Sequence, residues 1–415
     1  MPHTPHSQLR GPPRRAAHAP RRRRDGDLAG CRTARGGGGH GSLLLSSLAA
    51  LLALAAAHAR TVTLFNDRVR VDVAGDVVDA HDGCIVAFGG QYFLYGEYYG
   101  NLTGGSFANG GWGNSPQLSV YSSPDLVQWT FRGHLFNASV PANATFTKWI
   151  PTAMVSNGTV VLWFGSGAWS VATSRDGVSF DLVSRYETSR LGGSTDGTGV
   201  FLDDDGVGYV AFAALDKGGA LGGGHLVSIE RLAPDLLASS KVNVSDFMPL
   251  DYVESPALFK RGATYYLLTG SCCCACRGGG GLAVYTAASM NGPWALQQHS
   301  DINCAADVPL CGGFGARQVG RAELVYNAQW WSVSKIPTAG GGDAFILSGR
   351  RWLSGAGNNA SCDDMCFNDG RPMAPCVNAQ YQLRNDLDVL YPLEFAADGS
   401  ILPLRALQNF SLDLP

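Results

Sequence analysis

The sequence predicts an all-β fold, a five-bladed β-propeller with antiparallel four-stranded blades. Helical periodicity is nearly absent from the 415 residues, and what recurs is a short strand-forming run entered through a Gly, Asn or Asp turn. Five such runs start 68, 48, 56 and 66 residues apart, at residues 88–95, 156–163, 204–211, 260–267 and 326–332. This spacing is the length of a four-stranded sheet with its loops, and radial repetition of such sheets is typical of a propeller.

A second pattern follows several of these runs, in the order strand, Ser/Asp turn, aromatic residue. It is found at residues 120–129, 171–180 and 284–294. A β-sandwich or a two-domain all-β chain is the alternative, but no linker rich in Pro or Ser divides residues 60–415. With 54 Gly, 45% hydrophobic and 16% charged residues, the chain can bury a core, which excludes a disordered or collagen-like protein.

Residues 1–59 are expected to be a basic leader, either a signal peptide or a signal anchor, in front of one domain at residues 60–415. Four consecutive arginines at 21–24 precede an apolar stretch at 43–57 and the small-residue exit Ala57-His58-Ala59. We therefore expect a secreted, extracellular protein with no membrane contact unless the leader is retained as an anchor. Glycosylation sequons agree with this route, and they lie at Asn101, Asn137, Asn143, Asn157, Asn243, Asn359 and Asn409.

The charge indicates which partners the protein can bind, and the cysteine content indicates the compartment in which it folds. Residues 60–415 carry 22 basic and 32 acidic side chains, a net charge of −10, so no basic stripe is present to bind nucleic acid. Of the 11 cysteines, Cys31 lies in the leader, and the remaining even number in a secreted chain predicts disulfides. A thiolate metal site around residues 272–276 is the alternative, although the usual pair of Cys-x-x-Cys motifs is missing.

Four motifs precede or follow these runs in an ordered way, at residues 79–85, 123–129, 194–206 and 252–260. Together they resemble glycoside hydrolase family 43, whose members are five-bladed propellers that cut arabinan, xylan and galactan. Ala-His at 80–81, Tyr-Gly-Glu at 95–97 and Glu-Ser-Pro-Ala at 254–257 are most similar to its exo-β-1,3-galactanase branch. The resemblance implies an inverting hydrolase of a polysaccharide or oligosaccharide, with three acidic residues at the propeller axis. We expect a monomer.

Glu254 and Asp196 match two of these acids. Glu254 stands before a Pro and an apolar strand, where burial would raise its pKa and keep it protonated as the general acid. The family pattern places Asp196 as the acid that orients it and tunes its pKa. The alternatives are an ordinary surface Glu and an Asx turn beside Gly197. The acidic run at 203–205 is expected to be a solvated hairpin turn rather than a calcium loop.

The general base has three candidates. Counting back ten residues from Tyr92, as the family pattern does, leads to Asp82, which ranks first. Asp79 ranks second, as a base or a substrate-binding residue. The galactanase branch has Gly at the position of Asp82 and uses a Gln in its last blade, and the counterpart here is Gln318, expected to position substrate.

Two further residues are predicted to bind substrate. His81 either lines the pocket or is hydrogen-bonded structure. Trp149 either stacks on a sugar face or belongs to the core between blades. Trp149-Ile150-Pro151 also stands where the branch has an acidic residue in Glu-Arg-Pro. We expect no metal ligands and no cofactor, with an axial cation such as calcium left open, and the competing function is a non-catalytic carbohydrate-binding propeller that has lost efficient hydrolysis.

Overall fold

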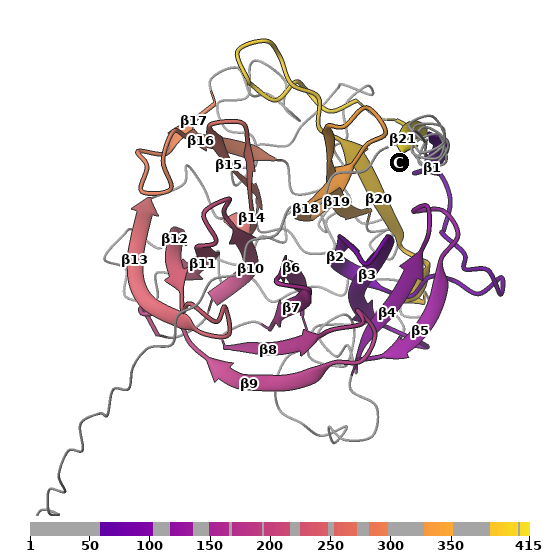
Figure 1. Cartoon of the computed structure of the whole chain (residues 1–415), viewed down its shortest axis with the longest axis horizontal. Helices are drawn as coiled ribbons and strands as arrows, with labels where there is room; N and C mark the ends of the chain where they lie inside the picture. The colour runs from indigo at the N-terminus through magenta and orange to yellow at the C-terminus, as the bar shows by residue number, and fades with distance from the viewer. Residues whose placement is uncertain are drawn as a thin grey trace, which may run out of the picture. The chain divides into compact units, whose positions relative to one another are not determined.

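The computed structural model describes residues 59–102, 117–135, 149–165, 168–192, 195–215, 225–247, 253–271, 282–297, 328–351, 382–405 and 407–415. Five antiparallel sheets of these residues surround a common centre (Figure 1). The predicted five-bladed β-propeller is therefore confirmed. The described residues hold no helix long and apolar enough to cross a membrane.

Each blade is formed by consecutive strands. Blade 1 contains β2 (His81–Phe88), β3 (Gln91–Tyr98), β4 (Gln117–Ser123) and β5 (Thr130–His134). Blade 2 contains β6 (Thr152–Ser156), β7 (Thr159–Phe164), β8 (Trp169–Ser174) and β9 (Asp181–Glu187). Blade 3 contains β10 (Thr195–Leu202), β11 (Gly208–Leu215), β12 (His225–Leu232) and β13 (Ser239–Phe247). Blade 4 contains β14 (Val253–Arg261), β15 (Thr264–Ser271), β16 (Ala283–Ala287) and β17 (Ala295–Leu296). Blade 5 contains β18 (Gln329–Pro337), β19 (Asp343–Arg351) and β20 (Leu387–Pro392), with the short 3₁₀ helix η4 (Leu383–Asn385) before β20.

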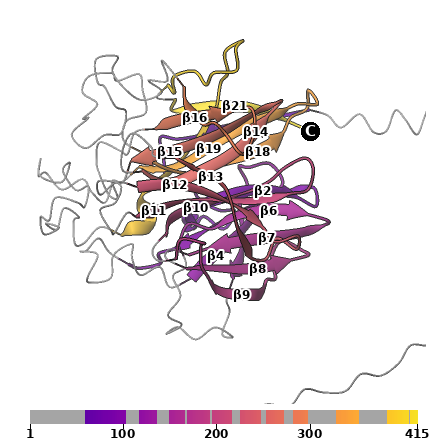
Figure 2. The same cartoon turned by 90° about the vertical axis from the view of Figure 1, so that its left-hand side faces the viewer.

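The two ends of the described chain close the ring beside blade 5. β1 (Arg60–Phe65) pairs antiparallel with β21 (Asn409–Leu414), with Leu64 opposite Phe410. The Asn66 side chain then donates to the carbonyl of Leu390 in β20, at 2.8 Å. Figure 2 shows β21 at the opposite side of the propeller from β9. The pairing ties the first strand to the last.

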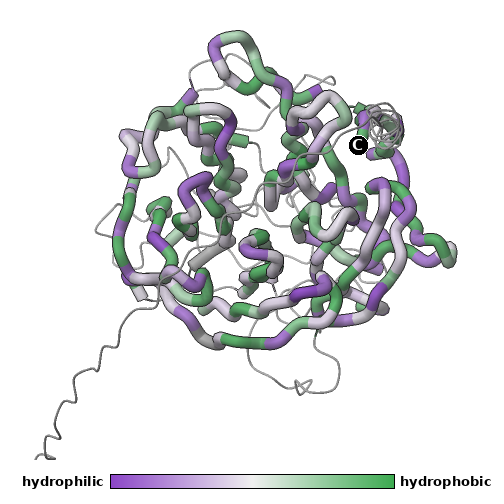
Figure 3. The backbone as a smooth tube through the Cα atoms, in the orientation of Figure 1, coloured by the Kyte–Doolittle hydropathy of each residue, from purple (hydrophilic) through white to green (hydrophobic). Residues whose placement is uncertain are grey.

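The hydrophobic core is divided into layers between neighbouring blades. Tyr95 and Leu118 of blade 1, for example, pack with Leu162 and Ala172 of blade 2. Comparable clusters join blades 2 and 3, 3 and 4, 4 and 5, and 5 and 1. Figure 3 shows hydrophobic segments in every blade. Packing one sheet on the next removes both faces from water, which is why inner strands such as β3 and β7 are buried on both sides, whereas outer strands such as β5 and β13 are partly or largely exposed.

The second repeated sequence pattern is a turn held by an aspartate. After β4, Asp125 accepts hydrogen bonds from the backbone N–H groups of Val127 and Gln128 and from the hydroxyl of Ser123. After β8, Asp176 binds Val178, Ser179 and Ser174 in the same way. These Asx turns join the third and fourth strands of their blades. The pattern is therefore local turn chemistry repeated at the same position of blades 1 and 2.

Two predictions need correction. Asp203 is not a solvated turn residue, because it is only 8% exposed and accepts hydrogen bonds from Lys260 and Tyr265 of blade 4, whereas Asp204 and Asp205 are exposed. Cys84 in β2 is a buried free thiol, so the ten cysteines after the leader do not all pair. The other nine lie outside the described residues.

Candidate active site

The chain enters the innermost strands of blades 1 to 4 through a residue in the left-handed conformation. These residues are Asp82, Ile150, Gly197 and Ser255, with φ angles of 54°, 46°, 64° and 49°. In β2, β10 and β14 each lies within a β-bulge. Bulges re-aim the side chains next to them and are common beside active sites. The equivalent residues just before the left-handed position are His81, Trp149, Asp196 and Glu254.

Asp196 and Glu254 lie on neighbouring innermost strands, β10 and β14. A Cβ atom added to Gly197 would lie 2.3 Å from the backbone nitrogen of Ser255, so the chain just after Asp196 abuts the chain just after Glu254. Only glycine fits this approach. The backbones of the two predicted acids therefore stand at equivalent, adjacent positions of blades 3 and 4.

Glu254 is buried, with 6% exposure. Its Oε2 accepts a hydrogen bond of 2.7 Å from the side-chain amide of Gln329 in β18. Gln329 in turn pairs with Arg350 in β19 across the fifth blade. The general-acid candidate is thus fixed from the neighbouring blade by a residue that the sequence did not single out.

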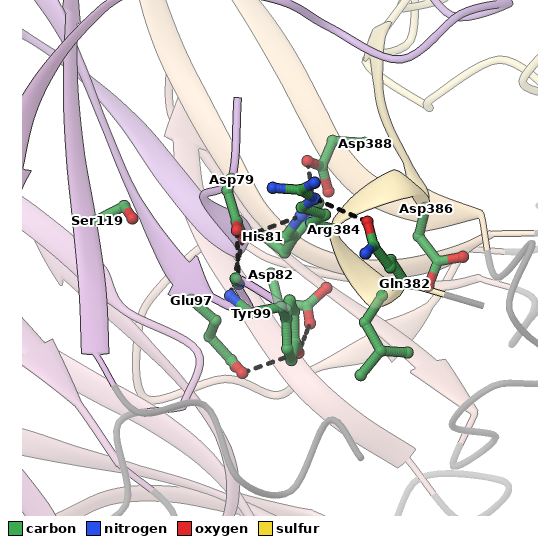
Figure 4. A network of polar contacts seen from close by, with 12 residues as sticks. Asp79, His81, Asp82, Glu97, Tyr99, Ser119, Gln382, Arg384, Asp386 and Asp388 are labelled. Atoms are coloured by element: carbon green, nitrogen blue, oxygen red, sulfur yellow. Dashed lines mark hydrogen bonds and ion pairs between the residues drawn. The ribbon is translucent and has the colours of Figure 1, made fainter. Parts of the chain in front are cut away.

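Asp82 lies in a buried polar network between blades 1 and 5 (Figure 4). Its Oδ2 accepts hydrogen bonds from Arg350 Nη1 at 2.8 Å and from the Tyr99 hydroxyl at 3.0 Å. Its Oδ1 is buried and has no hydrogen-bond partner among the described residues. Burial raises the pKa of Asp82, and the charges of Arg350 and His81 oppose that rise.

Arg350 is the cation of this network and is fully buried. It also binds Asp386 at 2.7 Å and the carbonyl oxygen of Leu383 at 3.2 Å. The Tyr99 ring lies under its guanidinium, 4.6 Å from the ring centroid. Sequence reasoning missed Arg350, since 268 residues separate it from Asp82. The one available signal is an arginine pair at the end of β19, after the apolar run at 344–347.

His81 lies between two carboxylates. Its Nδ1 is 2.9 Å from Asp388 and its Nε2 is 3.4 Å from Asp79. Burial opposes a charge on the ring, but Asp388 and Asp79 raise the pKa of His81 to about 10. Asp79 also accepts hydrogen bonds from the N–H groups of Tyr99 and Gly100, at 2.8 and 2.7 Å. Both Asp79 oxygens therefore hold the turn after β3, and a role in substrate binding stays a prediction.

Two predicted substrate-binding residues remain, Trp149 and Gln318. Trp149 is partly buried and packs against a cluster that contains Tyr99, Ile150 and Trp331. Gln318 lies outside the described residues. Within the described ranges, no group of three or more His, Cys, Asp or Glu side chains is arranged to hold a metal ion.

Blades 3 and 4 thus carry acidic residues, Asp196 and Glu254, at equivalent positions of their innermost strands. The profile of the family described as Glycosyl hydrolases family 43 matches residues 78–307, more than half of the chain. The chain belongs to this family.

Individual relatives agree with this assignment. A β-D-galactofuranosidase of Aspergillus niger is 25% identical over 227 residues, which are 50% of this chain and 61% of the relative. The chain thus spans about three fifths of the length of that relative. Two solved structures share the fold, the exo-β-1,3-galactanases of Clostridium thermocellum and Phanerochaete chrysosporium. Both have a TM-score of 0.60, with 19% and 18% identity, and cover 85% of this chain and 67% and 69% of their own.

Proposed function

We propose that the protein is a secreted glycoside hydrolase that cleaves galactan-type or arabinan/xylan-type polysaccharide by an inverting general acid/base mechanism. The observation that carries this proposal is the placement of Asp196 and Glu254 at equivalent positions of adjacent innermost strands in a family 43 propeller, where the next residues, Gly197 and Ser255, abut. The galactofuranosidase and galactanase names of the relatives favour a galactose-containing substrate. The expected leader at residues 1–59 and the seven sequons support secretion.

Glu254 is assigned as the general acid. Its carboxyl is buried, a condition that favours the protonated form needed to protonate the leaving oxygen. The Gln329 amide fixes its orientation. Asp196, on the adjacent strand, is assigned to orient the acid and tune its pKa.

Asp82 is assigned as the general base. Inversion needs a second carboxylate that takes a proton from a water on the opposite face of the sugar, about 6.5–9.5 Å from the acid. Arg350 and Tyr99 occupy one oxygen of Asp82, and the other, Oδ1, lacks a partner among the described residues. A buried acceptor of this kind is satisfied by a water or a ligand hydroxyl.

The test compares the wild-type chain with Glu254→Gln on aryl galactosides, galactofuranosides, arabinosides and xylosides and on β-1,3-galactan. Loss of the acid should lower kcat by about 10²–10⁴-fold, because the leaving group is no longer protonated. Proton NMR of the fresh product should show the anomer opposite to that of the substrate. Equal rates for the two proteins would refute the enzymatic function, and retained sugar binding would then favour the carbohydrate-binding alternative.

A further inference from the structure

The Tyr99 hydroxyl lies between two buried carboxyl groups. Its oxygen is 3.0 Å from Oδ2 of Asp82 and 3.0 Å from Oε2 of Glu97 (Figure 4). A phenol has one hydrogen to donate. If both carboxyls were ionised, one of the two contacts would bring the phenol oxygen and a carboxylate oxygen together with no hydrogen between them. Such a contact is unfavourable here because Asp82 and Glu97 are only 5% and 3% exposed. One of the two carboxyls must therefore carry a proton and donate it to the phenol oxygen.

The surroundings of the two carboxyls decide which one carries it. Asp82 Oδ2 receives the guanidinium of Arg350 at 2.8 Å, which favours its ionised form. Glu97 has no cation of the described residues within ion-pair distance. Its Oε1 accepts a neutral backbone hydrogen bond from Ile150, at 3.0 Å. The proton belongs on Oε2 of Glu97.

We propose that Glu97 is a protonated positioning residue that donates to Tyr99, so that the Tyr99 hydrogen is held toward Asp82 and keeps Asp82 an anion. The inference rests on the proposed function for its catalytic meaning, because the anion it supports is the assigned general base. Hydrogen bonds then run in one direction, from Glu97 to Tyr99 to Asp82, and Arg350 donates to the same Asp82 oxygen. Oδ1 of Asp82 is left to accept a proton from water.

The electrostatics agree with this assignment. Burial, and then the charge of Asp82, raise the pKa of Glu97 well above its usual range. The other charged or titratable groups around Asp82 come from several elements. They are His81 of β2, Tyr99 and Glu97 of blade 1, Arg350 of β19, Asp386 before β20, and Asp388 of β20. Asp386 and Asp388 are engaged by Arg350 and His81, so they do not compete for Tyr99.

Infrared spectroscopy of the full chain tests where the proton is, without any need for activity. In the background of Glu254→Gln, which removes the carboxyl of the general-acid candidate, the carbonyl stretch of a protonated carboxylic acid should be present at pH 7 and should be lost when Glu97→Gln is added. It should persist when Asp82→Asn is added instead. Glutamine suits the site because its carbonyl accepts from Ile150 while its amide donates to Tyr99. A band that survives Glu97→Gln, or that disappears in Asp82→Asn instead, overturns the assignment.

The pH profile of kcat/KM tests the positioning role. Tyr99→Phe removes a hydrogen bond to the Asp82 anion, so the low-pH limb should move to higher pH by about one unit. Glu97→Leu should move it in the same direction, and Glu97→Gln should restore the wild-type position. A role confined to structure would lower the rate at every pH without moving the limb, and that result would refute the positioning role.

The two proposals fail in different ways. If none of the proteins hydrolyses a glycoside, the proposed function fails and the infrared result still decides the protonation of Glu97. If hydrolysis is observed but the band and the limb do not respond to Glu97, the positioning role fails and the hydrolase assignment stands.

Discussion

At the scale of single residues, the predicted base and the predicted acid occupy positions of their bulges that differ by one residue. Glu254 and Asp196 precede the left-handed residue of their bulges, whereas Asp82 is itself the left-handed residue of blade 1. The position equivalent to Glu254 is filled by His81. The spacing from Tyr92 predicts Asp82 but not the β-bulge at this position. The bulge directs the Asp82 carboxylate to Arg350 of blade 5.

The charge on His81 leads to a prediction about stability and pH. Since the folded-state pKa of His81 is raised to about 10 from 6.5, the stabilisation it provides is complete below about pH 6.5 and is lost as the pH rises through 10. His81→Gln should therefore lower the free energy of unfolding most at pH 6, and the difference from wild type should shrink by pH 10. Urea denaturation at pH 6, 8 and 10 measures this. A deficit that does not change with pH would show that His81 is neutral in the folded protein.

At the scale of elements, polar links join neighbouring blades of the ring. Lys260 and Tyr265 of blade 4 hold Asp203 of blade 3, and Arg350 of blade 5 holds Asp82 of blade 1. Asp203, Lys260 and Tyr265 lie in or next to hairpin turns. Asp82 lies at the start of the innermost strand β2. The second should matter more for stability, because its partners are fully removed from water.

Removing Arg350 should leave two buried carboxylates, Asp82 and Asp386, without their cation. We expect Arg350→Met to lower the free energy of unfolding by about 3–5 kcal/mol, measured by urea denaturation. Lys335→Met is the matched control in the neighbouring strand, because its ion pair with Asp343 is exposed and should contribute little. Adding Asp82→Asn to Arg350→Met should recover part of the loss. Strict additivity of the two changes would contradict the pairing.

At the scale of the whole molecule, stability depends on closing the ring. The β1–β21 pair contributes Val62, Leu64, Phe410 and Leu412 to the cluster between blades 5 and 1. This cluster is formed only when both ends of residues 59–415 are in place. A propeller that is not closed exposes two sheet faces and an unpaired edge.

A pair of substitutions on β1 tests the closure. Leu64→Ala removes a side chain that is 4% exposed and should cost about 2–4 kcal/mol of the free energy of unfolding. Thr63→Ala, on the opposite face of the same strand, removes only an exposed contact with Ser411. It should change the free energy of unfolding by less than about 0.5 kcal/mol. Thermal or urea unfolding measures both. Equal effects would mean that the pair does not pack on the blades.

The sequence by itself determined the propeller and its family, because turns, strand patterns and short motifs are local and repeat in each blade. It also led to the prediction of Glu254 and Asp196 as catalytic acids, because their motifs lie within single strands. It gave no role to Arg350, Glu97, Tyr99 or Gln329, although Glu97 stands in the Tyr-Gly-Glu motif at 95–97. Those residues acquire their roles only when the ring closes and blade 5 meets blades 1 and 4. Burial and pairing between blades are properties of the tertiary structure. The carboxyls of Asp82 and Glu97 are about equally buried, and the pairing of Arg350 with Asp82 leaves the proton on Glu97.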